Sequence, residues 1–550
     1  MTGGLYMLGH DAVAQALVDQ GVDTVFGVLG DGNLFIGENL IREHGVRFVA
    51  ATHEANAVCM AEGWAKASGR LGIATVTHGP GLTNTITALV EGVRNRTPMV
   101  LVAGDTPREA RHHLQAIDQH ALVASTGAGF ESVRNAGTIP ADVAMAVRRA
   151  HAERRPIVLN IALDMEWEDV EYVPVPRVSR PATVLAPDMD SLDEAVGLIA
   201  SATRPLILAG RGAAFSGARD SLVELAERLG APVATTLLGA GLFEGDSHNL
   251  GIFGTLSHRV AGETVASADC IIAFGAALTQ YTTDHATMLA GKRVVQIDID
   301  PEALAKHGPV DAIVLGDAAA TARTIIEMLD AAEHSPAAFR SDALAAELAT
   351  FDRSAEFVDL STDDAIDPRT ATIALNAALP DDRTVVIDAG RFMLNALTLS
   401  VPNPRSLVTS HGFAAIGLGT STAIGAAVAT PGRPTVLGVG DGGFMMGGLA
   451  ELHTAVHHGL DLIVLLYNDG SYGAEHIQLH RKNMDTSASL HEWPDFVAVA
   501  ETLGCAATRV SNVADLKAAE DLIKNRTPGQ PVLIEIGLDP DMVSTIPMGH

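Results

Sequence analysis

The feature that most constrains the fold is the alternation of short apolar runs with longer amphipathic stretches along almost the whole chain. The runs include "PIVLNI" (156–161), "PLILAG" (205–210) and "PTVLGV" (434–439). Apolar runs of strand length, separated by helix-length amphipathic segments, are typical of parallel strands joined by helical crossovers. The pattern therefore predicts an α/β fold with doubly wound parallel sheets.

The chain has 550 residues, which is too many for one ordinary core when domains hold roughly 100 to 200 residues. Two segments interrupt the alternation: the proline-rich "EYVPVPRVSRPATVLAP" (171–187) and the polar "DLSTDDAIDP" (359–368). We therefore expect three doubly wound domains, at residues 1–180, 181–355 and 356–550. The first and third have similar alternation, so they could be distant structural copies.

Charge and cysteine usage limit the classes of partner and compartment. The formal net charge is -29 and no long Lys or Arg run occurs, which argues against nucleic acid or an anionic membrane as a main partner. We expect a small-molecule partner instead. Cys59, Cys270 and Cys505 lie far apart without C-x-x-C spacing, which fits a reducing compartment. No apolar run approaches the roughly 18 to 20 residues needed to span a bilayer, so we expect a soluble cytoplasmic protein.

Two turns rich in Gly and Asp follow apolar runs in the last third of the chain. Gly440-Asp441-Gly442 follows "PTVLGV", and Asn468-Asp469-Gly470 follows "LDLIVLLY". Ligands of open α/β sheets collect at the carboxyl ends of the strands, so both turns should lie at such an edge. Acidic and amide oxygens from neighbouring strand ends suit a hard cation such as Mg²⁺, which leaves room for phosphate oxygens. Taken singly, each turn could be an ordinary loop.

The stretch "GDGGFMM…YNDGSYG" resembles the diphosphate and magnesium motif of the thiamine diphosphate-dependent enzymes, the group that includes pyruvate decarboxylase, benzoylformate decarboxylase and acetolactate synthase. The resemblance implies that the side chain of Asp441 ligates Mg²⁺. Counting along the motif gives Asn468 as the second ligand, whereas alignment on "GSYG" gives Asp469. We favour Asp469 because the strand and "GSYG" then align without a gap. The carbonyl of Ser471 would be the third ligand.

The resemblance extends to the other cofactor loops. "TSHGFAAIGLGTSTAIGAA" resembles the family segment that contacts the aminopyrimidine ring, and it places Ile416 beneath the cofactor, although Ile416 could also be a core residue. "VVIDAGRF" resembles the segment beside the diphosphate or the pyrimidine. The cofactor-binding residues that the resemblance implies in these loops are Gly390, Arg391, Phe392, Ile416, Gly440, Asp441, Gly442, Gly443, Asp469, Ser471 and Tyr472.

"ATHEANAVCMAEGWAKASGR" closely resembles the helix that carries the catalytic glutamate of the family, here Glu54. In that role Glu54 shares a proton with ring nitrogen N1' of the aminopyrimidine, which activates the cofactor. A simpler interpretation is that Glu54 only caps a helix that begins near His53. "HGPGLTN", which follows an apolar run, belongs to the same family pattern.

Four features bear on the reaction. By resemblance to pyruvate decarboxylase, Asp31 in "VFGVLGDGNLF" and the pair His112-His113 would be catalytic, and so would Glu475, six residues after Asp469. His78 in "THGPG" lies close to the position of a working histidine in benzoylformate decarboxylase. Such acid and base groups favour protonation of the decarboxylated carbon and release of an aldehyde. Each has a plainer alternative as a turn, surface or capping residue, and the surroundings of the His pair resemble acetolactate synthase equally well.

The resulting hypothesis is a thiamine diphosphate- and Mg²⁺-dependent lyase that decarboxylates a 2-oxo acid to an aldehyde, with acyloin carboligation as a side reaction. The alternative is an acetolactate-synthase-like carboligase. A flavin or nucleotide in the central domain, suggested by "PLILAGRGAAFSGA", is a third possibility. In the family Glu54 faces the cofactor of another subunit, so the resemblance implies a dimer at least and points to a dimer of dimers. The sequence does not identify the 2-oxo acid or the role of the C-terminal tail.

Overall fold

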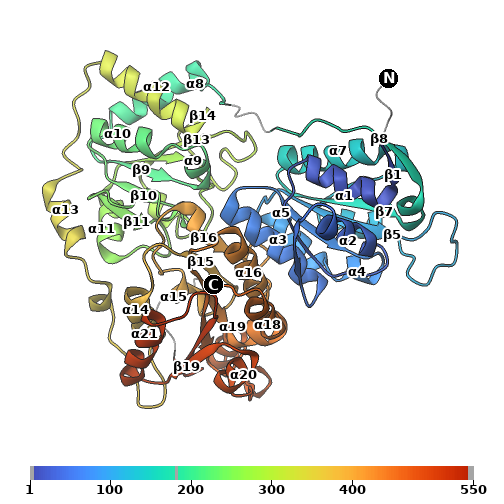
Figure 1. Ribbon diagram of the computed structural model, residues 1–550. Helices are drawn as coiled ribbons and strands as arrows, with labels where there is room; N and C mark the ends of the chain where they lie inside the picture. The colour runs from blue at the N-terminus through green and yellow to red at the C-terminus, as the bar shows by residue number, and fades with distance from the viewer. Residues whose placement is uncertain (1–4, 180–183, 543–550) are drawn as a thin grey trace. The chain divides into compact units, whose positions relative to one another are not determined.

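The computed structural model describes residues 5–179 and 184–542, and in these ranges it contains three six-stranded parallel sheets with helices on both faces (Figure 1). The predicted doubly wound α/β class is therefore confirmed. A two-stranded antiparallel ribbon joins β1 (Leu5–Leu8) to β8 (Asp169–Tyr172). By contact, Pro181–Val358 and Ser400–Leu407 form one compact unit, and the remaining segments form the other.

The first and third sheets have the same strand order. The first runs β3-β2-β4-β5-β7-β6 and the third β16-β15-β17-β18-β20-β19, which is 2-1-3-4-6-5 in each case. The strands of the first sheet are β2 (Thr24–Gly27), β3 (Arg47–Ala50), β4 (Gly72–Val76), β5 (Met99–Asp105), β6 (Gly129–Ser132) and β7 (Pro156–Ala162). Those of the third are β15 (Thr384–Ile387), β16 (Leu407–Thr409), β17 (Thr435–Gly440), β18 (Leu462–Asn468), β19 (Ala506–Val510) and β20 (Val532–Gly537). This identity agrees with the prediction that the two segments are structural copies.

The second sheet has a different order, β11-β10-β9-β12-β13-β14, which is 3-2-1-4-5-6. Its strands are β9 (Pro205–Ala209), β10 (Val233–Thr235), β11 (Asn249–Ile252), β12 (Cys270–Phe274), β13 (Arg293–Asp298) and β14 (Ala312–Leu315). Its helices are α8 (Met189–Ala200), α9 (Arg211–Phe215), α10 (Arg219–Leu229), α11 (Arg259–Ser267), α12 (Ala318–Ala331) and α13 (Asp342–Ala349). This order is typical of dinucleotide-binding sheets, but fold alone does not assign a ligand, and flavin or nucleotide binding stays a prediction.

Helices cover both faces of the first sheet because its strands are apolar on both sides. In β5, Val100 and Val102 face one core, and Leu101 and Ala103 face the other. Residues that alternate along a strand point to opposite faces, so continuous apolar runs are expected of strands buried on both sides. The helices of this sheet are α1 (Gly9–Asp19), α2 (Leu34–Arg42), α3 (Glu54–Ser68), α4 (Pro80–Thr83), α5 (Ile86–Arg94), α6 (Gln119–Ala124) and α7 (Ile139–Glu153).

Helix α3 packs against α16 of the third sheet with close backbone contact. A methyl group at Gly63 would overlap the Thr422 carbonyl, and one at Gly425 would overlap the Met60 carbonyl. The core of the first sheet therefore continues into that of the third. The helical segments of the third sheet are α14 (Pro368–Ala378), α15 (Met393–Ala396), α16 (Gly419–Ala429), α17 (Asp441–Gly443), a π-helix (Phe444–Gly448), α18 (Leu449–His457), α19 (Gly473–Arg481), α20 (Phe496–Leu503) and α21 (Leu516–Lys524).

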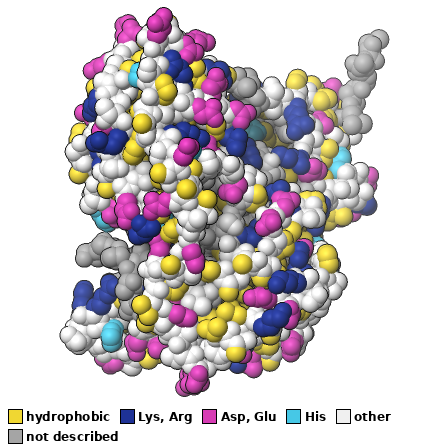
Figure 2. All heavy atoms as spheres, turned by 90° about the vertical axis from the view of Figure 1, so that its left-hand side faces the viewer, with side chains coloured by type: hydrophobic (Ala, Val, Ile, Leu, Met, Phe, Trp, Pro, Cys, Tyr) yellow, Lys and Arg dark blue, Asp and Glu magenta, His cyan; other side chains and the backbone are white. Residues whose placement is uncertain are grey.

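One face of the surface shows how the charged side chains are distributed. On the face drawn in Figure 2, Lys and Arg side chains are scattered among Asp and Glu side chains and do not gather into one basic patch. Binding to a phosphate backbone depends on clustered cations. Within the described ranges, each helix is too short or too polar to cross a bilayer.

Glu166, in the 3-10 turn Leu163–Trp167, is buried without a compensating partner. Its side chain is 0% exposed, and within residues 5–179 and 184–542 neither carboxyl oxygen has a hydrogen-bond partner. Burial raises the pKa of Glu166 to about 8. The folded protein thus retains a proton that the unfolded chain releases near its ordinary pKa of 4.5. This contribution to stability is fully present below that value and is lost as the pH rises toward 8.

We expect Glu166→Gln to raise the free energy of unfolding at pH 8 by on the order of 3 kcal/mol, because the amide has no ionised form to desolvate. Near pH 4.5 the variant and the wild type should be similarly stable. Urea unfolding at the two pH values measures the difference. Equal stability of the two proteins at pH 8 would contradict the assigned burial of this carboxyl.

We expect Gly425→Ala to destabilise the protein by about 2 kcal/mol or more, since the added methyl must push α3 and α16 apart. Gly262→Ala in α11 is the matched control, because among the described residues no atom outside the local backbone of α11 lies within 4 Å of the added carbon. The control should be neutral or slightly stabilising. Thermal unfolding of the two variants provides the comparison, and a Gly425→Ala protein as stable as wild type would exclude the close helix contact.

Candidate active site

Two turns at the carboxyl edge of the third sheet carry the predicted metal ligands. Strand β17 ends at Gly440, and Asp441 begins a helical segment that continues from α17 through the π-helix into α18. Strand β18 is the parallel neighbour of β17 and ends at Asn468. The segment after β17 and the turn after β18 therefore lie side by side, as the sequence predicts.

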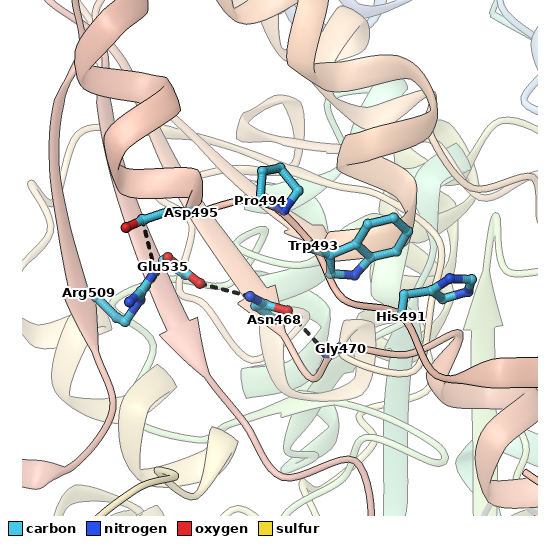
Figure 3. A pocket seen from close by; sticks show the side chains of 8 residues that line it. All are labelled: Asn468, Gly470, His491, Trp493, Pro494, Asp495, Arg509 and Glu535. Atoms are coloured by element: carbon cyan, nitrogen blue, oxygen red, sulfur yellow. Dashed lines mark hydrogen bonds and ion pairs between the residues drawn. The ribbon is translucent and has the colours of Figure 1, made fainter. Parts of the chain in front are cut away.

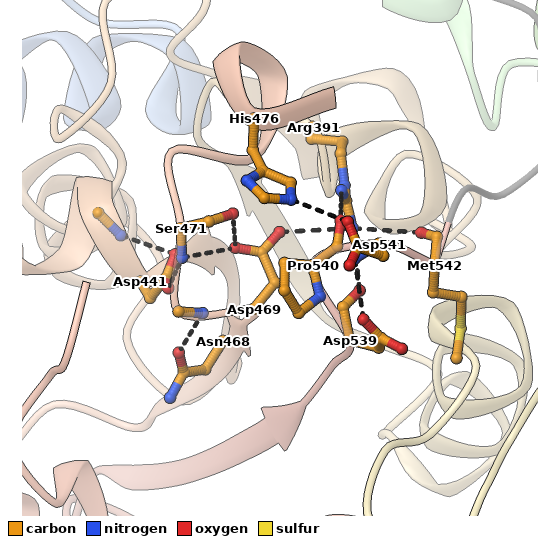
Figure 4. Close-up of polar contacts among 12 residues, drawn as sticks. Arg391, Asp441, Asn468, Asp469, Ser471, His476, Asp539, Pro540, Asp541 and Met542 are labelled. Atoms are coloured by element: carbon orange, nitrogen blue, oxygen red, sulfur yellow. Dashed lines mark hydrogen bonds and ion pairs between the residues drawn. The ribbon is translucent and has the colours of Figure 1, made fainter. Parts of the chain in front are cut away.

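The carboxyl group of Asp441 is 3% exposed and accepts three hydrogen bonds. Its Oδ1 accepts from the Gly442 amide at 2.8 Å. Its Oδ2 accepts from the Ser471 amide at 3.2 Å (Figure 4) and from Nε1 of Trp493 at 2.8 Å. Burial, and to a smaller extent the nearby charge of Asp469, raises the pKa of Asp441 to about 7. A divalent cation at this point would stabilise both carboxylates in their ionised forms.

Asn468 and Asp469 point in different directions. Nδ2 of Asn468 donates to Oε1 of Glu535 at 2.7 Å, and its Oδ1 accepts from the Gly470 amide at 3.0 Å. Asn468 thus lines a pocket of about 340 Å³ together with Glu535 and Trp493 (Figure 3). Asp469 lies close enough to Asp441 to raise its pKa. This geometry favours Asp469 over Asn468 as the second ligand.

The donor atoms at this edge fit a hard cation and a diphosphate. Two carboxylates, of Asp441 and Asp469, converge there, and the Ser471 carbonyl belongs to the same turn. No larger His, Cys, Asp or Glu cluster able to hold a metal forms among the described residues. Mg²⁺ commonly uses one or two carboxylates and takes its other ligands from water and phosphate. Backbone N–H groups where the helical segment starts would face the phosphates.

Arg391 joins this edge to the segment that follows β20. Its Nη2 lies 3.5 Å from Oδ2 of Asp469. Its Nη1 donates to the Pro540 carbonyl at 2.6 Å, and its Nη2 donates to the Met542 carbonyl at 3.2 Å (Figure 4). Nε2 of His476, a buried residue, lies 3.0 Å from Oδ1 of Asp541 on the same segment. The beginning of the C-terminal tail is thus attached beside the metal turn, while residues 543–550 lie outside the described residues.

The loops that would hold the cofactor ring follow β15 and β16. Phe392, which is 7% exposed, stacks on Tyr467 with ring centroids 5.2 Å apart and supports the Gly440 turn from the core side. Ile416 is only half-buried, as a residue that lines an open site should be, and is not a sealed core residue. Tyr472 packs its ring against the backbone of Gly442.

Two buried carboxylates hold the loop that carries Ile416. Asp388 accepts from the Gly417 amide at 2.9 Å, and burial raises the pKa of Asp388 to about 6. Glu91, on α5 of the first sheet, accepts from the amides of Gly412 and Phe413 at 2.8 and 2.6 Å. The loop is therefore fixed from both sheets.

Glu54 is the first residue of α3, directly after the loop that leaves β3. The helix cap is His53, whose ring nitrogen accepts from the Ala55 amide at 3.2 Å. The Glu54 carboxyl is half-buried, and its Oε2 accepts from Nδ2 of Asn84 at 2.9 Å. The structure thus assigns the side-chain cap to His53, which leaves the Glu54 carboxyl available for another role.

Three of the predicted acid and base residues lie together at the carboxyl edge of the first sheet. His78 follows β4 and is 1% exposed, and its ring lies edge-on to that of His113, with centroids 5.4 Å apart. Burial and the neighbouring His113 lower the pKa of His78, and the charge of Asp31 acts against them. In the part of the chain that the structure describes, Nε2 of His78 has no hydrogen-bond partner. His112 and Glu475 are exposed, and neither makes a described contact with this group.

Some residues that shape the site have no signal in the sequence. Gln119 is 3% exposed and holds the turn after His78, because its Oε1 accepts from the Gly79 amide at 2.8 Å. Trp493 orients Asp441 from 52 residues further along the chain. Gln119 begins the short helix α6 and Trp493 lies in a loop, and neither segment carries a motif, so only the tertiary contacts reveal them.

Comparison with known families gives three matches along the chain. They are the N-terminal TPP binding domain of thiamine pyrophosphate enzymes over residues 7–122, the central domain over 192–325 and the C-terminal TPP binding domain over 388–536. The N-terminal match contains strands β2 to β5 of the first sheet, the central match contains the whole second sheet, and the C-terminal match contains β16 to β19 and most of β20 of the third sheet.

The names of three similar proteins state three different activities. An acetolactate synthase large subunit of Parasynechococcus marenigrum is 30% identical, covering 92% of this chain and 83% of that protein. A probable 2-ketoarginine decarboxylase of Pseudomonas aeruginosa is also 30% identical, with 92% and 90% covered. A sulfoacetaldehyde acetyltransferase of Rhodobacter capsulatus is 31% identical, with 80% and 78% covered. These identities do not separate a decarboxylase from a carboligase.

We expect Asp469→Ala to weaken Mg²⁺ binding in the presence of thiamine diphosphate by at least about tenfold, because the substitution would remove one of the two predicted carboxylate ligands. Asn468→Ala, one position away, should weaken it much less, since that side chain bonds Glu535 and Gly470. Titration of each variant with Mg²⁺, followed by tryptophan fluorescence, measures the affinities. The reverse order of effects would assign the ligand to Asn468.

Proposed function

Because this chain belongs to the thiamine diphosphate-dependent enzyme family, we propose that it is a lyase that decarboxylates a 2-oxo acid to an aldehyde with thiamine diphosphate and Mg²⁺. Acyloin formation would be a side reaction. The observation that carries the proposal is the group of Asp31, His78 and His113 at one sheet edge. Such groups can donate and accept protons, which supports a decarboxylase that must protonate its product.

Asp441, Asp469 and the carbonyl of Ser471 would hold Mg²⁺, and the metal would hold the diphosphate. When bound, the cofactor supplies the nucleophilic carbon and accepts the electron pair left by carbon dioxide. Glu54 would hold a proton at ring nitrogen N1'. Asn84 occupies only its Oε2, so Oε1 is left for the ring. Ile416 would support the ring from below.

Release of an aldehyde requires a proton at the carbon that has lost carbon dioxide. His113 and Asp31 can hold and deliver that proton, because both adjoin the buried ring of His78. The lowered pKa of His78 favours its neutral form near pH 7, which can either accept or donate a hydrogen bond. Closely placed proton donors of this kind favour an aldehyde over a hydroxyketone.

The second candidate is an acetolactate-synthase-like carboligase, in which a second carbonyl compound reacts in place of the proton. The similarity to acetolactate synthases supports it. Incubation with a panel of single 2-oxo acids, thiamine diphosphate and Mg²⁺ separates the two functions. Accumulation of aldehyde supports the lyase, and accumulation of a hydroxyketone supports the carboligase.

We further propose a dimer as the smallest active unit and a dimer of dimers in solution. The support is the family resemblance, in which Glu54 serves the cofactor held by another subunit. Light scattering of the protein with bound cofactor tests this assembly, and an active monomer would contradict it.

We expect Glu54→Gln to lower kcat by at least about 100-fold, because the amide cannot exchange a proton with the ring nitrogen. Glu171→Gln, an exposed position on β8, is the control and should retain full activity. Product formation from the best 2-oxo acid of the panel gives the rates. Full activity of Glu54→Gln would rule out the assigned proton exchange.

A further inference from the structure

A buried glutamate on the metal-binding segment reaches the loop that carries Glu54. Glu451 lies on α18, in the helical segment that begins at Asp441, and its side chain is 0% exposed. Its Oε1 accepts from the Thr52 amide at 2.8 Å and from the Thr52 hydroxyl at 2.7 Å. The same oxygen accepts from Nδ2 of Asn56 at 2.8 Å. One carboxylate oxygen of the third-sheet segment thus accepts hydrogen bonds from three donors on the loop and helix that follow β3 of the first sheet.

The partners of Glu451 lie on both sides of the proposed catalytic carboxyl. Thr52 precedes Glu54 by two residues, and Asn56 follows it by two. Because the bond to the Thr52 amide fixes the main chain just before the helix, it limits where Glu54 can point. Hydrogen bonds to a carboxylate are stronger than those between neutral groups, and buried ones are screened little by water.

The arrangement differs from a general packing contact. Within the described residues, Oε2 of Glu451 is buried and has no hydrogen-bond partner, so all of its bonds are directed to Thr52 and Asn56. The side chain of Glu501, on α20 of the same unit, is exposed by contrast.

We propose that Glu451 is a positioning residue that holds Glu54 in place and links it to the metal-binding segment. The inference rests on the proposed function of Glu54. Asp441 and Glu451 belong to one continuous helical segment, so a cation and diphosphate that order its start also order the residue that holds Thr52. The role assigned to Glu451 acts through Thr52 and Asn56 and requires no contact with cofactor or substrate.

Hydrogen exchange of a peptide covering residues 50–58 tests the link without reference to catalysis. We expect Glu451→Ala to speed exchange of this peptide by at least about tenfold, and Glu451→Gln to restore part of the protection, because its amide oxygen still accepts hydrogen bonds. In the wild type, Mg²⁺ with thiamine diphosphate should slow the exchange further, and in Glu451→Ala it should not. Glu501→Ala, on exposed α20, is the control.

The kinetic readout is the pair of kcat and cofactor affinity. In Glu451→Ala kcat should fall about tenfold or more, whereas the affinity for thiamine diphosphate with Mg²⁺ should stay within about threefold of wild type. Thr52→Val removes one donor and keeps the main-chain amide, so it should give a smaller effect of the same kind. If Glu451→Ala does not fold, Thr52→Val alone tests the positioning role. Its effect should be absent in the Glu451→Ala background.

The outcomes distinguish this inference from the proposed function. Wild-type exchange and wild-type kcat in a folded Glu451→Ala or Thr52→Val protein would overturn the positioning role, as would a lower melting temperature with unchanged kcat. If exchange changes as expected but Glu54→Gln is fully active, the proposed function of Glu54 fails and the link to Glu451 stands as a structural contact only, which also overturns the positioning role.

Discussion

The contact between α3 and α16 determines the arrangement of the whole thiamine-binding unit. At Gly63 and Gly425 the two helices approach so closely that carbonyl oxygens occupy the space of a side chain. Glycine has no Cβ, so it alone permits this distance, and the cost in helix propensity is roughly 1 kcal/mol per glycine. The contact merges the cores of the first and third sheets into one. Residues from one sheet can then reach the loops of the other.

Buried glutamates use this proximity in both directions. Glu451 crosses from the third sheet to Thr52, and Glu91 crosses from the first sheet to Gly412 and Phe413. Each therefore fixes a loop that the other sheet presents, one with Glu54 and one with Ile416. Charges this deeply buried are costly unless they are hydrogen-bonded, and the N–H groups at these loops meet that requirement. The bonds that fix the two loops lie within the protein itself, which reduces the ordering that ligand binding would otherwise require.

The carboxyl edge of the third sheet, where the metal is predicted to bind, differs from these two loops because two carboxylates lie close together there. Asp441 and Asp469 lie close together, and their mutual repulsion together with burial makes the ionised pair unfavourable in the absence of a cation. Arg391 partly balances Asp469, and it also holds the tail segment through the carbonyls of Pro540 and Met542. The start of the tail and the metal turn thus share one cation. A change in the charge of Asp469 would therefore alter the position of the tail segment, because the guanidinium of Arg391 contacts both.

The sequence by itself determined the α/β class, the division into three sheets and the positions of the two glycine-rich turns, because strand length, alternation and turn chemistry are local properties. It placed Glu54 and His78 shortly after the runs that form β3 and β4 of the first sheet, and Asp441 directly after the run that forms β17 of the third. Parallel strands bring such residues to the carboxyl edge of each sheet. The tertiary structure decided which of Asn468 and Asp469 points toward the predicted metal site. Asn468 is turned away by its hydrogen bond to Glu535, whereas Asp469 pairs with Arg391 on the other side. It also decided that His113, and not His112, adjoins His78. Glu451 lies 399 residues from Thr52, and a contact over that separation depends on helix packing that no local pattern records.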